Sequence, residues 1–146
     1  MRTPRKPVEQ RVQYGALPYR SNGARTEVML VTSRETRRWI IPKGWPHKGR
    51  TPHRSAAREA YEEAGVVGRV RKDPLGFFLY EKHLRTGSIV VCNVQVFALE
   101  VQRQRRNWPE RHVREIKWLS PGQAARAVRE PMLAKIIRRL IRVTNS

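Results

Sequence analysis

The segment from Thr51 to Gly65 constrains the fold most strongly, because it carries both a start and a stop signal for a helix. Thr51 suits an N-cap, and Pro52 follows at the first helical position, where a backbone N–H is not needed. Gly65 is the residue type that commonly ends a helix in the left-handed conformation. The segment therefore predicts a helix with a narrow face of small side chains, suited to close packing, at alanines 56, 57, 60 and 64.

Three of the twelve acidic residues in the chain fall within five positions of this helix, at Glu59, Glu62 and Glu63. Helix positions i, i+3 and i+4 share a face, with Cβ atoms roughly 5–6 Å apart. Carboxylates this close repel one another and raise each other's pKa values. Basic neighbours or a divalent cation would remove that cost, and Mg²⁺ and Mn²⁺ both prefer carboxylate oxygens. The spacing alone leaves two interpretations open, a solvated acidic face with ion pairs such as Arg58–Glu62 and a metal site.

The elements around this helix predict a single α/β domain over residues 12–146, preceded by a flexible basic tail over residues 1–11. Asn-Gly at 22–23 favours a tight turn between the first two strands, and Ser120 with Gln123 forms a capping box that starts a helix over 121–129. Strands are expected at 12–19, 26–33, 37–42, 68–83, 88–101 and 114–120, with a loop at 43–50. A last helix carries an apolar stripe that is expected to join the core, formed by Met132, Leu133, Ile136, Ile137, Leu140 and Ile141.

The charge of the chain predicts an anionic partner. Lys and Arg number 31 against 12 Asp and Glu, which gives a net charge of +19. Such a surface attracts polyanions and speeds their association, so nucleic acid, polyphosphates and acidic membranes all qualify. No apolar run approaches the roughly 20 residues that span a bilayer, and no apolar segment follows the basic N-terminus as in a signal peptide. With Cys92 as the single cysteine, these features predict a cytoplasmic protein, either a monomer or a dimer.

A longer pattern resembles a known family. Read from Gly44, the chain runs G-x5-R-x7-R-E-A-x-E-E-x-G-V, which resembles the Nudix box, G-x5-E-x7-R-E-U-x-E-E-x-G-U, where U is a bulky apolar residue. Gly44, Arg58, the three glutamates, Gly65 and Val66 fall on matching positions. The stretches GALPYR, WIIPKG and REIKWLSPGQAA are also Nudix-like, so the resemblance covers most of residues 12–140. It implies an α/β/α sandwich with a mixed sheet.

The resemblance also implies an activity. Nudix hydrolases cleave a pyrophosphate bond in a nucleoside diphosphate linked to another group, or in a related polyphosphate. By position, Glu59, Glu62 and Glu63 would hold Mg²⁺ or Mn²⁺ with the Gly44 carbonyl, and Arg58 would orient a ligand carboxylate. The metal would neutralise the diphosphate and lower the pKa of a bound water that attacks phosphorus. The general base would be a box glutamate or Glu110 from a later loop, with Glu115 as its rival.

Two positions depart from the family pattern. Ala60 replaces a bulky residue, and Arg50 stands where the family usually has its first glutamate. A guanidinium cannot brace Arg58, because like charges repel, so we expect Glu62 to brace Arg58. Arg50 is expected to face the polyphosphate and to pair with its oxygens. An active enzyme is favoured; the alternative is a catalytically weak Nudix scaffold that binds nucleic acid or another polyanion.

Basic residues near the box are candidates for binding substrate phosphates. Those preferred are Lys43, Lys48 and Arg50, with Arg20 and Arg38 as further candidates, although a solvated basic loop is an open alternative. Trp45, Tyr80 and Trp108 are either base-stacking or packing residues. The four histidines have no metal-ligand spacing with one another, so zinc is not expected. The motifs look most like the branch that hydrolyses diphosphoinositol polyphosphates and diadenosine polyphosphates, while ADP-ribose, oxidised nucleoside triphosphates and the 5′ end of RNA stay open.

Overall fold

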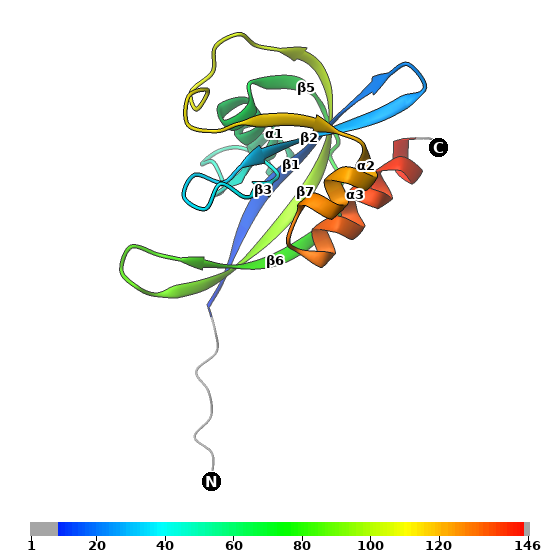
Figure 1. The fold of residues 1–146 in the computed structure, drawn as a ribbon. Coiled ribbons are helices and arrows are strands. Elements are labelled where there is room, and N and C mark those ends of the chain that lie inside the picture. Colours follow the sequence, from blue (N-terminus) through cyan, green and yellow to red (C-terminus); the bar gives the residue numbers. More distant parts are fainter. Residues whose placement is uncertain (1–8, 145–146) are drawn as a thin grey trace.

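The computed structural model describes residues 9–144, which form a twisted sheet flanked by helices (Figure 1). The strands of this region are β1 (Gln10–Asn22), β2 (Arg25–Thr32), β3 (Trp39–Ile40), β4 (Lys43–Gly44), β5 (Val66–Val70), β6 (Gly76–His83), β7 (Ile89–Gln104) and β8 (Ile116–Leu119). The helices are α1 (Pro52–Ala64), α2 (Pro121–Ala127) and α3 (Pro131–Thr144).

The sheet is mixed, as predicted. Its main path runs β3-β2-β1-β7-β5, while β4 pairs with β1, β6 with β7 and β8 with β2. The β1–β7 pairing is parallel, from Gln10 beside Val91 to Tyr19 beside Glu100, and the other pairings are antiparallel. The two longest strands therefore form the centre of the domain, and every other element is placed relative to them.

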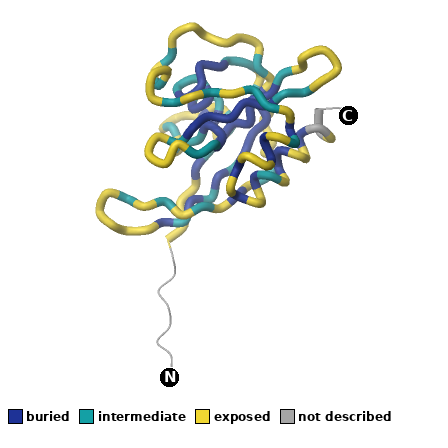
Figure 2. The backbone as a smooth tube through the Cα atoms, viewed as in Figure 1, coloured by how far each residue is buried: buried dark blue, intermediate teal, exposed yellow. Residues whose placement is uncertain are grey.

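Helices cover both sides of this sheet, which confirms the α/β/α arrangement (Figure 1). Helix α1 packs against β1 and β5, whereas α2 packs against β2 and α3 against β6. The residues between these layers are buried (Figure 2), and most of them are apolar. Its largest fully buried side chains include Phe78, Phe97, Leu17, Met29 and Leu30.

The predicted helix ends are largely confirmed. Gly65 ends α1 with a φ of 71°, and its N–H bonds to the Tyr61 carbonyl. Thr51 occupies the N-cap position of α1, but its side chain makes no capping hydrogen bond. At α2, Ser120 and Gln123 form the complete predicted capping box. The alanines at 56, 60 and 64 are fully buried, so α1 approaches the sheet closely.

Several strand boundaries differ from the sequence expectation. The strand expected over 68–83 is two strands, β5 and β6, because they pair with different halves of β7. They separate at a bend that contains Pro74, which cannot donate a hydrogen bond to a strand ladder. The strand expected over 37–42 is reduced to β3, and Lys43–Gly44, expected in a loop, pairs with β1 as β4.

Both ends of the chain refine the expected boundaries. Gln10 and Arg11, expected in the tail, belong to β1 because they pair with Val91 and Cys92 of β7. Residues 1–8 of the expected tail lie outside the described residues. On α3, four stripe residues are buried as expected, namely Leu133, Ile136, Ile137 and Leu140. Met132 is 41% exposed instead, and the side chain of Ile141 lies outside the described part. Among residues 9–144, no helix has the length and apolar character needed to cross a membrane.

The Gly65 turn provides a test of this packing. Gly65 and Gly87 both have positive φ, at 71° and 86°, but only a Cβ on Gly65 would collide with the Trp108 ring. Gly87→Ala should cost about 1–2 kcal/mol from the backbone conformation alone. Gly65→Ala should cost clearly more, because Trp108 and its loop must also shift. Urea unfolding of both variants measures this difference, and equal losses would show that the Trp108 contact carries no energy.

Candidate active site

A cleft with a volume of about 1260 Å³ contains most of the residues that the sequence singled out. It is lined by parts of α1, β4, β6, the loop before β8 and the α2–α3 junction. The three glutamates of α1 and Glu110 contribute its acidic wall, and bases from other elements line the same cleft. The cleft therefore combines carboxylates with cations, as a site for a metal and a phosphate requires.

Close packing of β4 on β1 and of α1 on the sheet brings the box residues together. Gly44 pairs with Tyr14 of β1, and Lys43 pairs with Gly15. A Cβ on Gly44 would collide with the carboxylate of Glu59. The carboxylate thus lies directly against the Gly44 backbone, which explains why a glycine stands at this position.

The three glutamates of α1 differ in how far they are buried. Glu59 and Glu63 are buried, with 8% and 5% of their surface exposed, whereas Glu62 is half-buried. Nε of Arg58 donates a hydrogen bond of 2.8 Å to Oε1 of Glu62. This is the contact that was expected in place of the missing first box glutamate.

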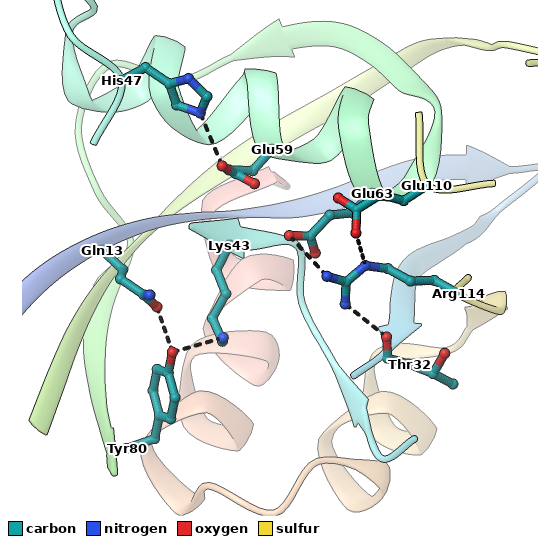
Figure 3. Close-up of polar contacts among 9 residues, drawn as sticks. All are labelled: Gln13, Thr32, Lys43, His47, Glu59, Glu63, Tyr80, Glu110 and Arg114. Carbon is teal, nitrogen blue, oxygen red and sulfur yellow. Dashed lines mark hydrogen bonds and ion pairs between the residues drawn. The ribbon is translucent and has the colours of Figure 1, made fainter. Parts of the chain in front are cut away.

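Arg114 connects Glu63 with Glu110 (Figure 3). Its Nε donates to Glu110 at 3.0 Å, one terminal nitrogen donates to the Thr32 carbonyl at 3.0 Å, and the other lies 3.7 Å from Glu63. The Glu110 N–H also bonds to the Glu62 carbonyl at 2.9 Å, which fixes this loop on α1. Arg114 was not predicted; its i,i+4 spacing from Glu110 was the available signal. The rival Glu115 is exposed, lies outside the cleft lining and pairs with Arg37.

Lys43 reaches the cleft as the terminal donor of a short hydrogen-bond chain (Figure 3). Its Nζ donates to the Tyr80 hydroxyl at 3.0 Å, and that hydroxyl donates to Gln13 Oε1 at 2.7 Å. The ammonium also lies 4.3 Å from the centre of the Tyr80 ring. Burial lowers the pKa of Lys43 to about 8, although the nearby Glu63 opposes this shift.

The buried carboxyl group of Glu63 has a strongly perturbed pKa. Burial raises the pKa of Glu63 to about 8, Glu59 adds to the rise, and Arg114 and Lys43 oppose it. A divalent cation would offset this desolvation and repulsion, because it brings positive charge among the oxygens. Gly44, Glu59, Glu62 and Glu63 supply the carbonyl and carboxylate oxygens that Mg²⁺ and Mn²⁺ accept. Carboxylate oxygens of Glu59 and Glu62 lie within 4.8 Å of each other, so these residues fit such an ion, whereas Glu63 lies outside that close group.

The candidate phosphate-binding bases separate into two groups. Lys43 and Arg38 line the cleft, and Arg38 also forms an ion pair of 2.8 Å with the buried Glu130. Lys48 and Arg50 are exposed and lie outside the cleft lining. Arg20 also lies outside it, where it pairs with Glu27 at 3.0 Å and covers the Trp118 ring.

The cleft is also lined by further basic residues and by aromatic residues. Besides Arg114, the cleft lining contains three Lys or Arg residues that the sequence analysis did not single out, Arg34, Lys82 and Arg129. They come from separate parts of the chain, so no local sequence pattern indicates that they line the same cleft. Trp45 and Tyr80 line the cleft, whereas Trp108 lies against Gly65 outside it.

His47 is a further residue whose placement the sequence did not indicate. Its Nε2 lies 3.0 Å from Oε1 of Glu59 (Figure 3). The sequence analysis compared the histidines only with one another, whereas the partners of His47 are glutamates. The signal that could have found it is its place in the loop that leads into the acidic helix.

Comparison with known proteins identifies the family. The chain matches the family model "NUDIX domain" over residues 9–141, so it belongs to the Nudix family. It is 32% identical over 124 residues to "Nudix hydrolase 13, mitochondrial" of Arabidopsis thaliana, a match that covers 80% of this chain and 60% of that protein. It is 35% identical over 85 residues to the Mus musculus "Diphosphoinositol polyphosphate phosphohydrolase 3-alpha", covering 58% of this chain and 48% of that protein.

The solved structures support the same fold. The crystal structure of C. elegans Ap4A hydrolase superposes with a TM-score of 0.66 at 18% identity, covering 91% of this chain and 97% of that one. This likeness concerns the fold. Together with the family match, it confirms the α/β Nudix architecture that the box predicted.

The raised pKa of Glu63 predicts a pH-dependent metal affinity. Below pH 8 the metal-free protein holds a proton on Glu63, and a cation must displace it. Apparent Mg²⁺ affinity should therefore rise by up to about tenfold per pH unit toward pH 8 and then level off. Calorimetric titrations in buffers of different ionisation enthalpy measure both the affinity and the released proton.

Glu63→Gln provides the control, because it should remove the released proton. The raised pKa of Glu63 also makes the stability of the metal-free fold depend on pH. Its contribution is fully present below pH 4.5 and is lost as the pH rises through about 8, because between these values the folded protein keeps a proton that the unfolded chain has already released. A wild-type Mg²⁺ affinity that does not change between pH 6 and 8 would contradict this assignment.

Proposed function

We propose that this chain hydrolyses a phosphoanhydride bond of a polyphosphorylated substrate, using a divalent cation held by Gly44, Glu59, Glu62 and Glu63. The observation that carries the proposal is that these carboxylates line one cleft together with Lys43, Arg34, Lys82 and Arg129. Acidic side chains hold the cation, and basic side chains on the other walls neutralise a substrate rich in negative charge. The bound cation, Mg²⁺ or Mn²⁺, would supply a water of lowered pKa and charge neutralisation at the diphosphate.

The protein's own residues have separable tasks in this proposal. Arg58 orients the carboxylate of Glu62, and Arg114 orients those of Glu63 and Glu110. Glu110 and Glu63 are the two candidates to accept a proton from the attacking water. Glu110 is half-buried in the cleft lining and accepts the hydrogen bond of Arg114 through Oε1, which leaves Oε2 to accept a proton. Lys43, fixed by Tyr80, contacts a phosphate oxygen.

The favoured substrates are diphosphoinositol polyphosphates and dinucleoside polyphosphates. Two observations support this choice, the number of bases around the cleft and the printed names of the mouse relative and of the C. elegans enzyme. Each additional phosphate on a substrate adds charge that the bases can match, so a compact, densely phosphorylated molecule suits this cleft. The chain spans 60% of the length of the Arabidopsis relative described above. The substrates of the whole protein are therefore part of this proposal.

A phosphate-release assay over a panel of polyphosphates, with Mg²⁺, with Mn²⁺ and with chelator, tests the activity. Wild-type protein should turn over at least one polyphosphate only when a cation is present. Glu62→Gln should reduce turnover by about a hundredfold or more, because a metal ligand is lost. Its thermal midpoint without metal should change by only a few degrees, because a half-exposed ion pair contributes about 1 kcal/mol or less.

Glu100→Gln is the matched control, since Glu100 is an exposed residue of β7 outside the cleft. It should retain wild-type turnover. Tight binding of polyphosphates or RNA without any cation-dependent release would instead favour the alternative role as a polyanion-binding scaffold.

A further inference from the structure

His47 is placed as a ligand would be, beside the carboxylates of α1. Its Nε2 lies 3.0 Å from Oε1 of Glu59. One ring nitrogen of His47 and one carboxylate oxygen each of Glu59 and Glu62 lie within 4.8 Å of one another. Glu59 is buried, and His47 and Glu62 are half-buried, so the three groups meet at the cleft wall and remain accessible.

The loop that carries His47 is fixed by the same helix. The His47 N–H donates a hydrogen bond of 3.1 Å to Oγ of Ser55, a fully buried residue. The His47 carbonyl accepts the Arg50 N–H at 3.0 Å, which closes a turn before α1. Ser55 and Glu59 lie four residues apart on one face of α1. The helix therefore fixes the backbone of His47 through Ser55 and receives its imidazole one turn later at Glu59.

The separation between the nitrogen and the oxygen matches that of two adjacent ligands on one ion. Octahedral ions such as Mg²⁺ bind oxygen at about 2.0–2.1 Å, so adjacent ligands at right angles lie about 3 Å apart, and opposite ligands about 4.2 Å apart. The observed 3.0 Å between Nε2 and Oε1 is an adjacent-ligand distance. One ligand atom from each of the three residues lies within 4.8 Å of the others, so the three groups are near enough to converge on one ion.

We propose that His47 is a nitrogen ligand of the divalent cation held by Glu59 and Glu62, and that it makes the site favour a transition-metal ion over Mg²⁺. The inference rests on the metal site of the proposed function and adds a residue that the box pattern does not contain. Mg²⁺ strongly prefers oxygen, whereas imidazole binds transition-metal ions well, so one nitrogen among oxygens shifts the selectivity. Neutral imidazole also adds a ligand without adding to the repulsion among the glutamates.

Ligation requires only a change of tautomer at His47. An ionised carboxylate only accepts hydrogen bonds, so the contact with Glu59 needs the hydrogen on Nε2. The other neutral tautomer, with its hydrogen on Nδ1, would leave the lone pair of Nε2 available to bind the cation. Glu59 would then hold the same cation through a carboxylate oxygen.

The direct test is pulsed electron paramagnetic resonance of Mn²⁺ bound to the purified protein. A directly coordinated imidazole nitrogen should give nitrogen modulation of the Mn²⁺ signal, and ¹⁵N-histidine labelling should change its frequencies. His47→Gln should abolish the modulation. His53→Gln is the matched control, because His53 lies on the first turn of α1 outside the cleft lining, and it should leave the modulation intact.

Calorimetric affinities of Mn²⁺ and Mg²⁺ for the same proteins give a second measurement. The ratio of Mn²⁺ to Mg²⁺ affinity should fall by about tenfold in His47→Gln and stay unchanged in His53→Gln. Mn²⁺ binding without nitrogen modulation, and with both affinities lowered equally, would overturn the inference and make His47 only a hydrogen-bond partner of Glu59. Absence of any Mn²⁺ binding to wild-type protein would instead contradict the proposed metal site itself.

Discussion

The close approach of α1 to the sheet is the constraint on which the site depends. The α1 residues Ala56, Ala60 and Ala64 are fully buried on the face that packs against the sheet, so no large side chain separates the helix from the strands. This proximity presses Glu59 against Gly44 and buries Glu63 beside Arg114. Without it the glutamates would form an ordinary solvated face, with little reason to bind a cation. The small-residue face of the helix and its acidic residues are thus parts of one arrangement.

The protein is strongly basic overall, but one wall of the cleft is acidic. The chain as a whole has a net charge of +19, yet four glutamates gather at one wall of the cleft. Their local cations, Arg58 and Arg114, are each held by specific carboxylates and serve mainly to orient them. In the proposed function, a divalent cation binds the acidic wall, and a polyanionic substrate binds both the cation and the basic residues of the cleft.

The sequence predicted those features that depend on local spacing. The box identified Gly44, Arg58 and the three glutamates, the Gly65 stop was correct, and the i,i+4 relation found the Arg58–Glu62 contact. Features that depend on tertiary contacts were not predictable in the same way. Arg114 reaches Glu63 across 51 positions because β8 follows a loop fixed on α1, and Lys43 meets Tyr80 only because β4 and β6 flank the same strands.

Two other differences have the same physical origin. A basic residue in a loop gives no signal of the direction of its side chain, which is why Lys48 and Arg50 were favoured while Arg34, Lys82 and Arg129 line the cleft. The bend between β5 and β6 follows from the length of β7, whose two halves each take a partner along one edge. Neither is encoded in a short stretch of residues.

The central claim is that the α1 carboxylates and the Gly44 carbonyl hold a divalent cation. Anomalous diffraction from crystals grown with Mn²⁺, collected on both sides of the manganese absorption edge, tests it most directly. The account predicts a strong anomalous peak within bonding distance of Glu59, Glu62 and the Gly44 carbonyl. Well-ordered crystals at saturating Mn²⁺ with no peak in the cleft, or with peaks only at surface carboxylates elsewhere, would contradict it.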